Sequence, residues 1–505
     1  MATDENLQRQ IDNILGNSKE KEVEVIVQME SQRDKNSRLA IAAGGALSHR
    51  PQALSPRELL PERYNKRVAP KTIQQTSSVR TRLGQSKAQA IALEKTQQDA
   101  MAPLAPLIEN RSVGRALSRM SKPKKKSTRV KKRNNRFWTS RSMPLRLTRD
   151  ELSRLHKEVD NIRSICMNRS LRVPSLVETT STPKGAEEIT VSSWGLEKIN
   201  ALSVWGAYGA RGSGVTIGLL DTGVNAAHPD LEGKVEHWAE FDSMGQNLES
   251  DPYDSDEHGT HCAGTLVGSN KSGRFIGVAP EAKLAAALVL NGQNGGTDAQ
   301  VLAGIDWAVE MGVDVISLSL GGLVMDYETP PTYTEAILSC IEAGIPVIAA
   351  IGNEGEQTTG SPGNDVFALS VGATDAIDRA AGFSGGRTQV ISQSDYIADE
   401  FLPLAYLKPD LSAPGVAVFS SAPNGEYKSF SGTSMATPHV AGAIALLLSA
   451  TNIKAKEVGA RRAFTIQDLI CGSVKDLGEA GQDQRYGFGR LDVLRAVDFA
   501  RDLGY

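Results

Sequence analysis

Hydrophobic positions follow a repeating pattern in the last two thirds of this 505-residue chain. Short apolar runs alternate there with stretches of helical spacing. The apolar runs cover residues 215–220, 283–290, 313–320, 346–351 and 367–371, and the helical stretches cover 298–311, 334–343 and 433–450. Continuous apolar strands that alternate with helices are typical of a parallel sheet covered on both faces. The pattern therefore predicts an α/β fold, doubly wound around a mostly parallel sheet.

The first third predicts a smaller α+β domain. Residues 21–30 alternate charged and β-branched side chains, which is the period-2 pattern of a half-buried strand and the first ordered element that we expect. Helical spacing follows, then a strand, a helix that opens at Thr148 with Glu151 as its capping box, and another strand. The first helical stretch covers residues 85–109, and the two strands cover 137–147 and 162–167. The order strand, helix, strand, helix, strand predicts one small domain within residues 1–173.

Composition marks three further segments. Residues 174–190 are rich in Thr, Ser and Pro and poor in aromatics, which predicts a linker between the two domains. Residues 31–81 lack steady periodicity, so we interpret them as a long insertion. Residues 122–136 carry nine basic side chains and no acidic one, which is typical of a solvated loop.

The net charge of -3 conceals a sharp division. Residues 1–190 hold 37 Lys and Arg against 20 Asp and Glu, a balance of +17, whereas residues 191–505 hold 19 against 39, a balance of −20. Such halves are expected to attract each other. The alternative is that the basic run 122–136, with Phe137 and Trp138 after it, binds nucleic acid.

The N-terminus, the length of the apolar runs and the cysteines indicate where in the cell the protein is expected. The N-terminus is polar where a signal peptide requires an apolar stretch, and no run of about 18 apolar residues occurs. We therefore expect a cytoplasmic protein without a membrane span. The four cysteines form no CxxC pair, which predicts reduced thiols and neither a disulfide framework nor a zinc site. They are Cys166, Cys262, Cys340 and Cys471.

Three patches carry candidate chemistry. Asp221 ends an apolar strand in GLLDTG, His258 opens DEHGTHCAG, and Ser434 lies in SGTSMATPHVAG at the expected start of a helix of small residues. A helix start offers free N–H groups and a partial positive charge. Alone, DTG is equally a structural turn. His258 and His261 are spaced like metal ligands, but no third ligand is near in the sequence, so we predict no metal site.

With Asn353 in AAIGNEG, these patches resemble the signature blocks of subtilisin-like serine proteases, the subtilases. The resemblance covers about residues 190–495 and implies a subtilisin-like catalytic domain over 191–505 that hydrolyses peptide bonds through an acyl-enzyme. It implies that His258 accepts the proton of Ser434 and that Asp221 orients the imidazole. Asn353 and the backbone N–H of Ser434 would stabilise the oxyanion.

The resemblance also implies a cleft in which a peptide or protein substrate adds a strand between two edge segments. These substrate-binding residues are Gly295, Gly296, Thr297, Ser319, Leu320 and Gly321. Acidic residues crowd 249–257, just before His258. They suggest a preference for basic substrate side chains, or else a solvated acidic loop.

The chemistry of such an enzyme requires no cofactor. Residues 266–280 match a calcium loop of secreted relatives in length, but Lys271 falls where an oxygen ligand is needed, so structural calcium is not expected. Cys262 resembles the cysteine of thiol-containing subtilases, and we expect it to serve packing rather than catalysis.

Residues 1–173 resemble a subtilase propeptide, which implies an autoprocessed zymogen whose own N-terminal region is an inhibitory partner. Its tail, about residues 168–190, would lie in the cleft and contain the self-cleavage point. Two other functions stay open. One is a peptide ligase or macrocyclase on the same acyl-enzyme, and the other is an inactive scaffold with a nucleic-acid-binding arm.

Overall fold

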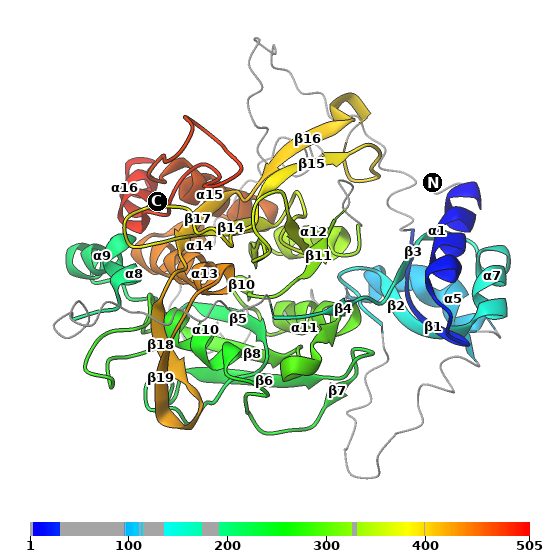
Figure 1. The fold of residues 1–505 in the computed structure, drawn as a ribbon, viewed down its shortest axis with the longest axis horizontal. Helices are drawn as coiled ribbons and strands as arrows, with labels where there is room; N and C mark the ends of the chain where they lie inside the picture. Colours follow the sequence, from blue (N-terminus) through cyan, green and yellow to red (C-terminus); the bar gives the residue numbers. More distant parts are fainter. Residues whose placement is uncertain are drawn as a thin grey trace, which may run out of the picture.

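The computed structural model describes residues 4–30, 95, 97–110, 113–114, 136–173, 191–325, 331–397 and 399–505. The expected insertion 31–81, the linker 174–190 and the basic run 122–136, except for its last residue, lie outside these residues. Figure 1 shows a smaller N-terminal part beside a larger α/β part.

An eight-stranded sheet forms the centre of the larger part. Its strands lie in the order β17 (Leu411–Pro414), β14 (Leu369–Thr374), β12 (Val347–Ala350), β10 (Val315–Leu318), β5 (Thr216–Asp221), β8 (Lys283–Leu288), β6 (Val235–Phe241) and β7 (Asn247–Leu248). Neighbouring strands run parallel except for β6 and β7, which are antiparallel. The predicted mostly parallel α/β fold is confirmed, and each predicted strand lies within four residues of its expected ends.

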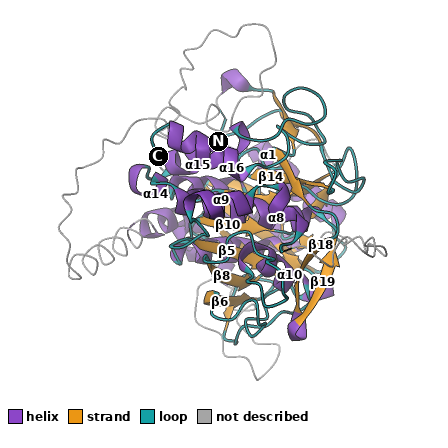
Figure 2. Ribbon diagram, turned by 90° about the vertical axis from the view of Figure 1, so that its left-hand side faces the viewer, coloured by secondary structure: helices purple, strands orange, loops and turns teal. Residues whose placement is uncertain are grey.

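Helices cover both faces of this sheet (Figure 2). The side chains of β5 alternate, so that Ile217 and Leu219 join one hydrophobic core while Leu220 joins the other. The first core contains α10 (His258–Val267) and α13 (Thr433–Ala450), and the second contains α11 (Asp298–Glu310) and α12 (Thr334–Glu342).

Helix α13 is the one described helix that is long and apolar enough to cross a membrane. It is 89% buried inside the protein. Its apolar surface is therefore used for packing in the core.

Short elements surround the sheet. The helices are α8 (Trp194–Lys198), α9 (Ala201–Tyr208), η2 (Gly292–Asn294), η3 (Asp399–Phe401), η4 (Pro423–Gly425), α14 (Ile453–Lys456), α15 (Ala460–Gly472) and α16 (Val493–Asp502). Strand β15 (Arg387–Ile391) pairs with β16 (Leu404–Lys408), β18 (Val418–Ala422) with β19 (Glu426–Phe430), and β11 (Gly322–Val324) with β13 (Thr359–Ser361).

The N-terminal part is a three-stranded antiparallel sheet in the order β2 (Ser142–Thr148), β1 (Glu22–Met29), β3 (Ile162–Met167). Its helices are α1 (Asp4–Asn17), η1 (Ala102–Leu104), α5 (Ala105–Glu109) and α7 (Arg149–Glu158). The predicted capping box of α7 is confirmed, because the side chain of Thr148 accepts from Glu151 N and Glu151 accepts from Thr148 N.

Two predictions for this part are wrong. The helix α1 precedes the strand that was expected to be the first ordered element. Strand β2 begins at Ser142 instead of residue 137, because Phe137 pairs with Ser142 across a tight turn.

The two faces of the small sheet have different partners. Val23, Val25 and Val27 of β1 pack in the core of the N-terminal part, whereas Ile26 belongs to the same cluster as α11 and α12. Gln28 is also buried, and its Nε2 donates to Thr332 O at 3.2 Å. Both faces are therefore covered, one of them by the larger part.

Candidate active site

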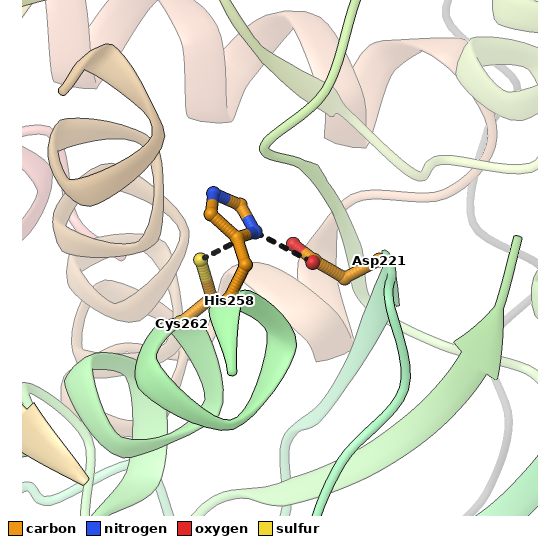
Figure 3. Close-up of side chains that lie close together, drawn as sticks. All are labelled: Asp221, His258 and Cys262. Atoms are coloured by element: carbon orange, nitrogen blue, oxygen red, sulfur yellow. Dashed lines mark hydrogen bonds and ion pairs between the residues drawn. The ribbon is translucent and has the colours of Figure 1, made fainter. Parts of the chain in front are cut away.

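Asp221 and His258 meet at the carboxyl edge of the sheet. Asp221 ends β5 and His258 begins α10, and Asp221 Oδ1 lies 2.7 Å from His258 Nδ1 (Figure 3). Both side chains are buried. The helix can approach the strand because its second residue is Gly259, where a Cβ would lie 2.0 Å from Gly223 O.

The electrostatics favour a strong base at His258. Burial alone would lower the pKa of the imidazole, but the Asp221 carboxylate raises it, as does Cys262, and the net pKa lies well above its ordinary value. Among the described residues, His258 Nε2 has no hydrogen-bond partner. The bond to Asp221 therefore places the proton of the neutral ring on Nδ1 and leaves the Nε2 lone pair available.

Ser434 is the second residue of α13, and Ser319, which follows β10, holds it from two sides. Ser434 Oγ donates to Ser319 O at 3.2 Å, and Ser319 Oγ donates to Ser434 O at 2.9 Å. The contribution of the Ser319 side chain was not foreseen from the sequence.

Asn353 follows β12 and lies against the start of α13. Its Oδ1 accepts from both the backbone N and the Oγ1 of Thr433, each at 2.8 Å. These two bonds fix the amide, so that its Nδ2 faces the Gly432 side, where a Cβ on Gly432 would lie 3.0 Å away. The role of Thr433 was missed, although it is the residue before Ser434 in the same motif.

Cys262 lies one helical turn after His258 (Figure 3). Its Sγ is 3.9 Å from His258 Nδ1 and 3.6 Å from Ser434 O. Burial raises the pKa of the thiol, so it stays neutral. The ligand atoms of Asp221, His258 and Cys262 lie within 4.8 Å of one another, but Nδ1 is already bonded to the carboxylate.

His261 does not join His258 in a metal pair. Its Nε2 lies 2.9 Å from Val418 O and 3.2 Å from Lys428 O, to which it donates, and its ring stacks on Phe430. Burial lowers the pKa of His261 to about 3. The ring is therefore neutral and fixes α10 to the β18–β19 hairpin.

Four of the six predicted cleft residues lie against the described start of the tail of the N-terminal part. Strand β4 (Ser170–Leu171) pairs antiparallel with β9 (Gly296–Thr297), and Arg172 exchanges two 3.3 Å backbone hydrogen bonds with Gly321. At Gly295 a Cβ would lie 2.1 Å from Leu171 O. Leu320 is buried in the same cluster as Leu171, and Ser319 contacts Ser434 instead. Residues 170–172, the described start of this tail, thus lie as a strand between the two edge segments.

The acidic residues before His258 have structural partners in part. Asp254 accepts from the hydroxyls of Thr222 and Thr260 at 2.7 and 2.6 Å. Glu257 forms an ion pair with Lys428. At least these two carboxylates therefore form hydrogen bonds or an ion pair with residues of the protein itself.

The loop 266–280, which matches a calcium loop of secreted relatives only in length, is held by a carboxylate. Asp230 Oδ1 accepts from Ser269 Oγ at 2.6 Å and from the backbone N of Lys271 at 2.7 Å, while its Oδ2 accepts from Tyr427. Both carboxylate oxygens of Asp230 therefore accept hydrogen bonds from protein donors.

Comparisons with known proteins agree with this geometry. The model of the Subtilase family matches residues 212–489. The chain is 38% identical to the intracellular serine protease of Paenibacillus polymyxa over 323 residues, which cover 62% of this chain and 89% of that protein. It is 33% identical over 412 residues to serine protease AprX of Bacillus subtilis (strain 168), covering 74% and 82%. Subtilisin DY of Bacillus licheniformis is 36% identical over 300 residues, covering 58% and 93%.

Proposed function

The chain belongs to the subtilase family and is a subtilisin-type serine endopeptidase, and we propose that Asp221, His258 and Ser434 are its catalytic triad. The observation that carries this proposal is the buried 2.7 Å hydrogen bond between Asp221 Oδ1 and His258 Nδ1. The other ring nitrogen, His258 Nε2, has no hydrogen-bond partner among the described residues. Its substrates are peptides and proteins.

The reaction follows from these positions. The Ser434 hydroxyl turns from Ser319 O to His258 Nε2, gives up its proton there and attacks the carbonyl carbon of the peptide bond. The tetrahedral intermediate collapses, and His258 gives that proton to the departing amine. Water then attacks the acyl-enzyme in the same way and releases the acid. Asp221 stabilises the imidazolium that forms in each half.

The oxyanion has two donors. The backbone N–H of Ser434 belongs to the first turn of α13, where N–H groups have no partner within the helix. The Asn353 amide presents Nδ2, since its oxygen is held by Thr433. Donors that are fixed before the reaction stabilise developing charge without further reorganisation.

The N-terminal part is proposed to be an inhibitory propeptide. Residues 170–172, at the start of its tail, pair with both edge segments of the cleft, where a bound tail would exclude a substrate strand. The charge division supports this assignment, because a segment of +17 precedes a domain of −20.

Two carboxylates of the larger part, Asp306 and Glu335, form hydrogen bonds and ion pairs with the N-terminal part. Asp306 accepts from the backbone N–H groups of Trp138 and Thr139 at 2.8 and 3.0 Å. Glu335 pairs with Arg141 at 2.6 Å and with Arg163 at 2.8 Å. These pairs are mostly buried, so they depend on an intact interface.

The experiment compares the full chain with its Ser434→Ala variant. Intact mass and N-terminal sequencing should show that the parent chain is cut in the region 168–190, whereas the variant stays whole and lacks peptidase activity. An unprocessed chain with full activity contradicts the zymogen. A variant that is still cut when purified alone contradicts self-cleavage. Product masses separate hydrolysis from ligation, and nothing among the described residues favours the ligase or the inactive scaffold.

A further inference from the structure

Asp298 holds one arginine of the tail with both carboxylate oxygens. Arg169 Nε lies 2.9 Å from Oδ2, Nη2 lies 3.1 Å from Oδ1, and the backbone N of Arg169 lies 3.0 Å from Oδ2. In return, Asp298 N donates to Arg169 O at 3.1 Å. This bidentate geometry fits the planar guanidinium and cannot be reproduced by an ammonium group.

The receptor for this guanidinium is built from three separate elements. Asp298 begins α11, Tyr333 precedes α12, and Ser361 ends β13. Tyr333 donates to Asp298 Oδ1 at 2.7 Å, and Ser361 Oγ accepts from Arg169 Nη2 at 3.3 Å. All three side chains are at least 99% buried, whereas Arg169 is about a quarter exposed. The three residues that form the site all belong to the larger part, and Arg169 of the N-terminal part binds to it from the solvent-exposed side.

The charges at this site are complementary. Burial opposes the charged form of Arg169, but Asp298 raises the pKa of the guanidinium above its ordinary value. Without a cation beside it, the carboxylate would be a buried charge that keeps only the Tyr333 hydroxyl and the backbone N–H of residue 169, an arrangement that is costly.

The site lies in line with the catalytic serine. Arg169 comes directly before β4, and three residues later Arg172 exchanges hydrogen bonds with Gly321. A peptide that continues in this antiparallel register pairs its residue two positions after Arg172 with Ser319, which bonds Ser434. We take the residue paired with Ser319 as the one directly before the bond that Ser434 attacks. Counted back from that bond, the residue in the guanidinium site is then the sixth.

We propose that Asp298, Tyr333 and Ser361 form an arginine subsite at the far end of the substrate cleft, and that the enzyme selects protein substrates with arginine six residues before the scissile bond. The proposal rests on the proposed function, since it takes the tail to follow the path of a substrate. It names a substrate feature that Arg169 occupies only while the tail is in place.

The first experiment uses the active enzyme obtained by expressing the full chain. Two ten-residue fluorogenic peptides differ only at the sixth position before the cleaved bond, with arginine in one and glutamine in the other. A charged bidentate pair predicts that kcat/KM is about tenfold higher for arginine, with lysine between the two. Equal values overturn the proposal. A five-residue peptide, which is too short to reach the arginine site, tests the proposed function separately. If this peptide is cleaved, the protein is a protease, and equal kcat/KM values for the two longer peptides then contradict only the arginine subsite.

Two matched variants locate the effect. Asp298→Asn should reduce the ratio of kcat/KM for arginine to that for glutamine to near one. Asp306→Asn makes the same change on the same helix, at a carboxylate that binds Trp138 and Thr139, and should keep the tenfold ratio. The ratio is measured within each variant, so a general loss of activity does not disturb it. If Asp298→Asn keeps the tenfold ratio of kcat/KM for arginine to that for glutamine, the proposal is overturned.

An independent test uses the full chain with Ser434→Ala. Arg169→Gln should increase hydrogen exchange of the tail amide at Leu171, which pairs with Gly296, by about tenfold, because the anchor of β4 is lost. Arg172→Gln is the control, since its side chain is exposed while its backbone makes the pairing. Equal exchange in both variants contradicts the assignment of Asp298 as the receptor.

Discussion

Ser434 Oγ donates its hydrogen bond to the backbone carbonyl of Ser319, 3.2 Å away. In the proposed substrate register, the same carbonyl would accept the N–H of the residue before the scissile bond. A bound peptide therefore competes with the serine hydroxyl for Ser319 O and turns the hydroxyl toward His258.

This competition predicts the effect of removing one N–H from a substrate. Methylating the backbone nitrogen of the residue before the scissile bond should lower kcat/KM about tenfold, the size of one lost hydrogen bond. Steady-state kinetics on the two peptides measures it. Methylation one residue earlier, where the peptide faces away from Ser319, is the control, and a larger loss there would contradict the register.

Thr433 is predicted to act through Asn353. Asn353→Ala should lower kcat by about 10² to 10³ with little change in KM, the range seen for the equivalent asparagine of subtilisin, a relative of this protein. Thr433→Val removes one of the two bonds to Asn353 Oδ1 and should lower kcat about tenfold.

Rescue separates positioning from general damage. Thr433→Ser restores a hydroxyl, which also accepts from Gly352 N at 3.3 Å, and should recover most of kcat together with the stability that this second bond contributes. If both variants lose the same activity, the hydroxyl does not position Asn353.

The pH profile should report the pKa of His258. Catalysis requires the neutral imidazole, and its pKa is raised by Asp221, so the ascending limb of kcat/KM should lie above about pH 6.5, the ordinary value. Activity is then lost as the pH falls through this pKa. Asp221→Asn removes the main charge that raises it, so the limb should move to lower pH while kcat falls by about 10⁴.

A nearby exposed acid provides the comparison. Glu249→Gln changes one charge in the loop before His258 and should leave the limb in place. An unmoved limb in Asp221→Asn would show that another group controls the profile.

Glu335 is predicted to control release of the N-terminal part. It pairs with Arg141 and Arg163, and Glu335→Gln leaves both guanidinium groups facing a neutral amide. Breaking mostly buried pairs costs about 3 kcal/mol. The lag before peptidase activity appears in refolded full chain should shorten. Glu281→Gln, at an exposed acid just before β8, should keep the parental lag, and equal lags in both variants would argue against the role of Glu335.

The fold of the larger part was predictable because its strands are continuous apolar runs and its proposed catalytic residues lie at their ends. Asp221, His258 and Ser434 each occupy the expected end of a strand or start of a helix. Strand β6 was missed because its side chains are mostly half-exposed and include two glutamates. The β15–β16 and β18–β19 hairpins were missed for a similar reason.

Contacts between distant residues could not be predicted. Arg169 and Asp298 are 129 positions apart, and neither lies in a recognisable motif. The sequence showed an excess of positive charge in one half and of negative charge in the other, but only the fold shows which arginine meets which carboxylate. The same holds for Thr433 and Asn353, whose contact requires α13 to begin beside the end of β12.

The pairing of β4 with β9 has a consequence for how activity would depend on concentration. While the tail is joined to the N-terminal part and to the catalytic part, it is held at the cleft at a local concentration on the order of millimolar. Once the chain is cut, the same contacts join two separate molecules, and their occupancy depends on the total protein present. Dilution alone would then release the enzyme, whereas a crowded pool of freshly cut chains would remain largely inhibited by its own fragments.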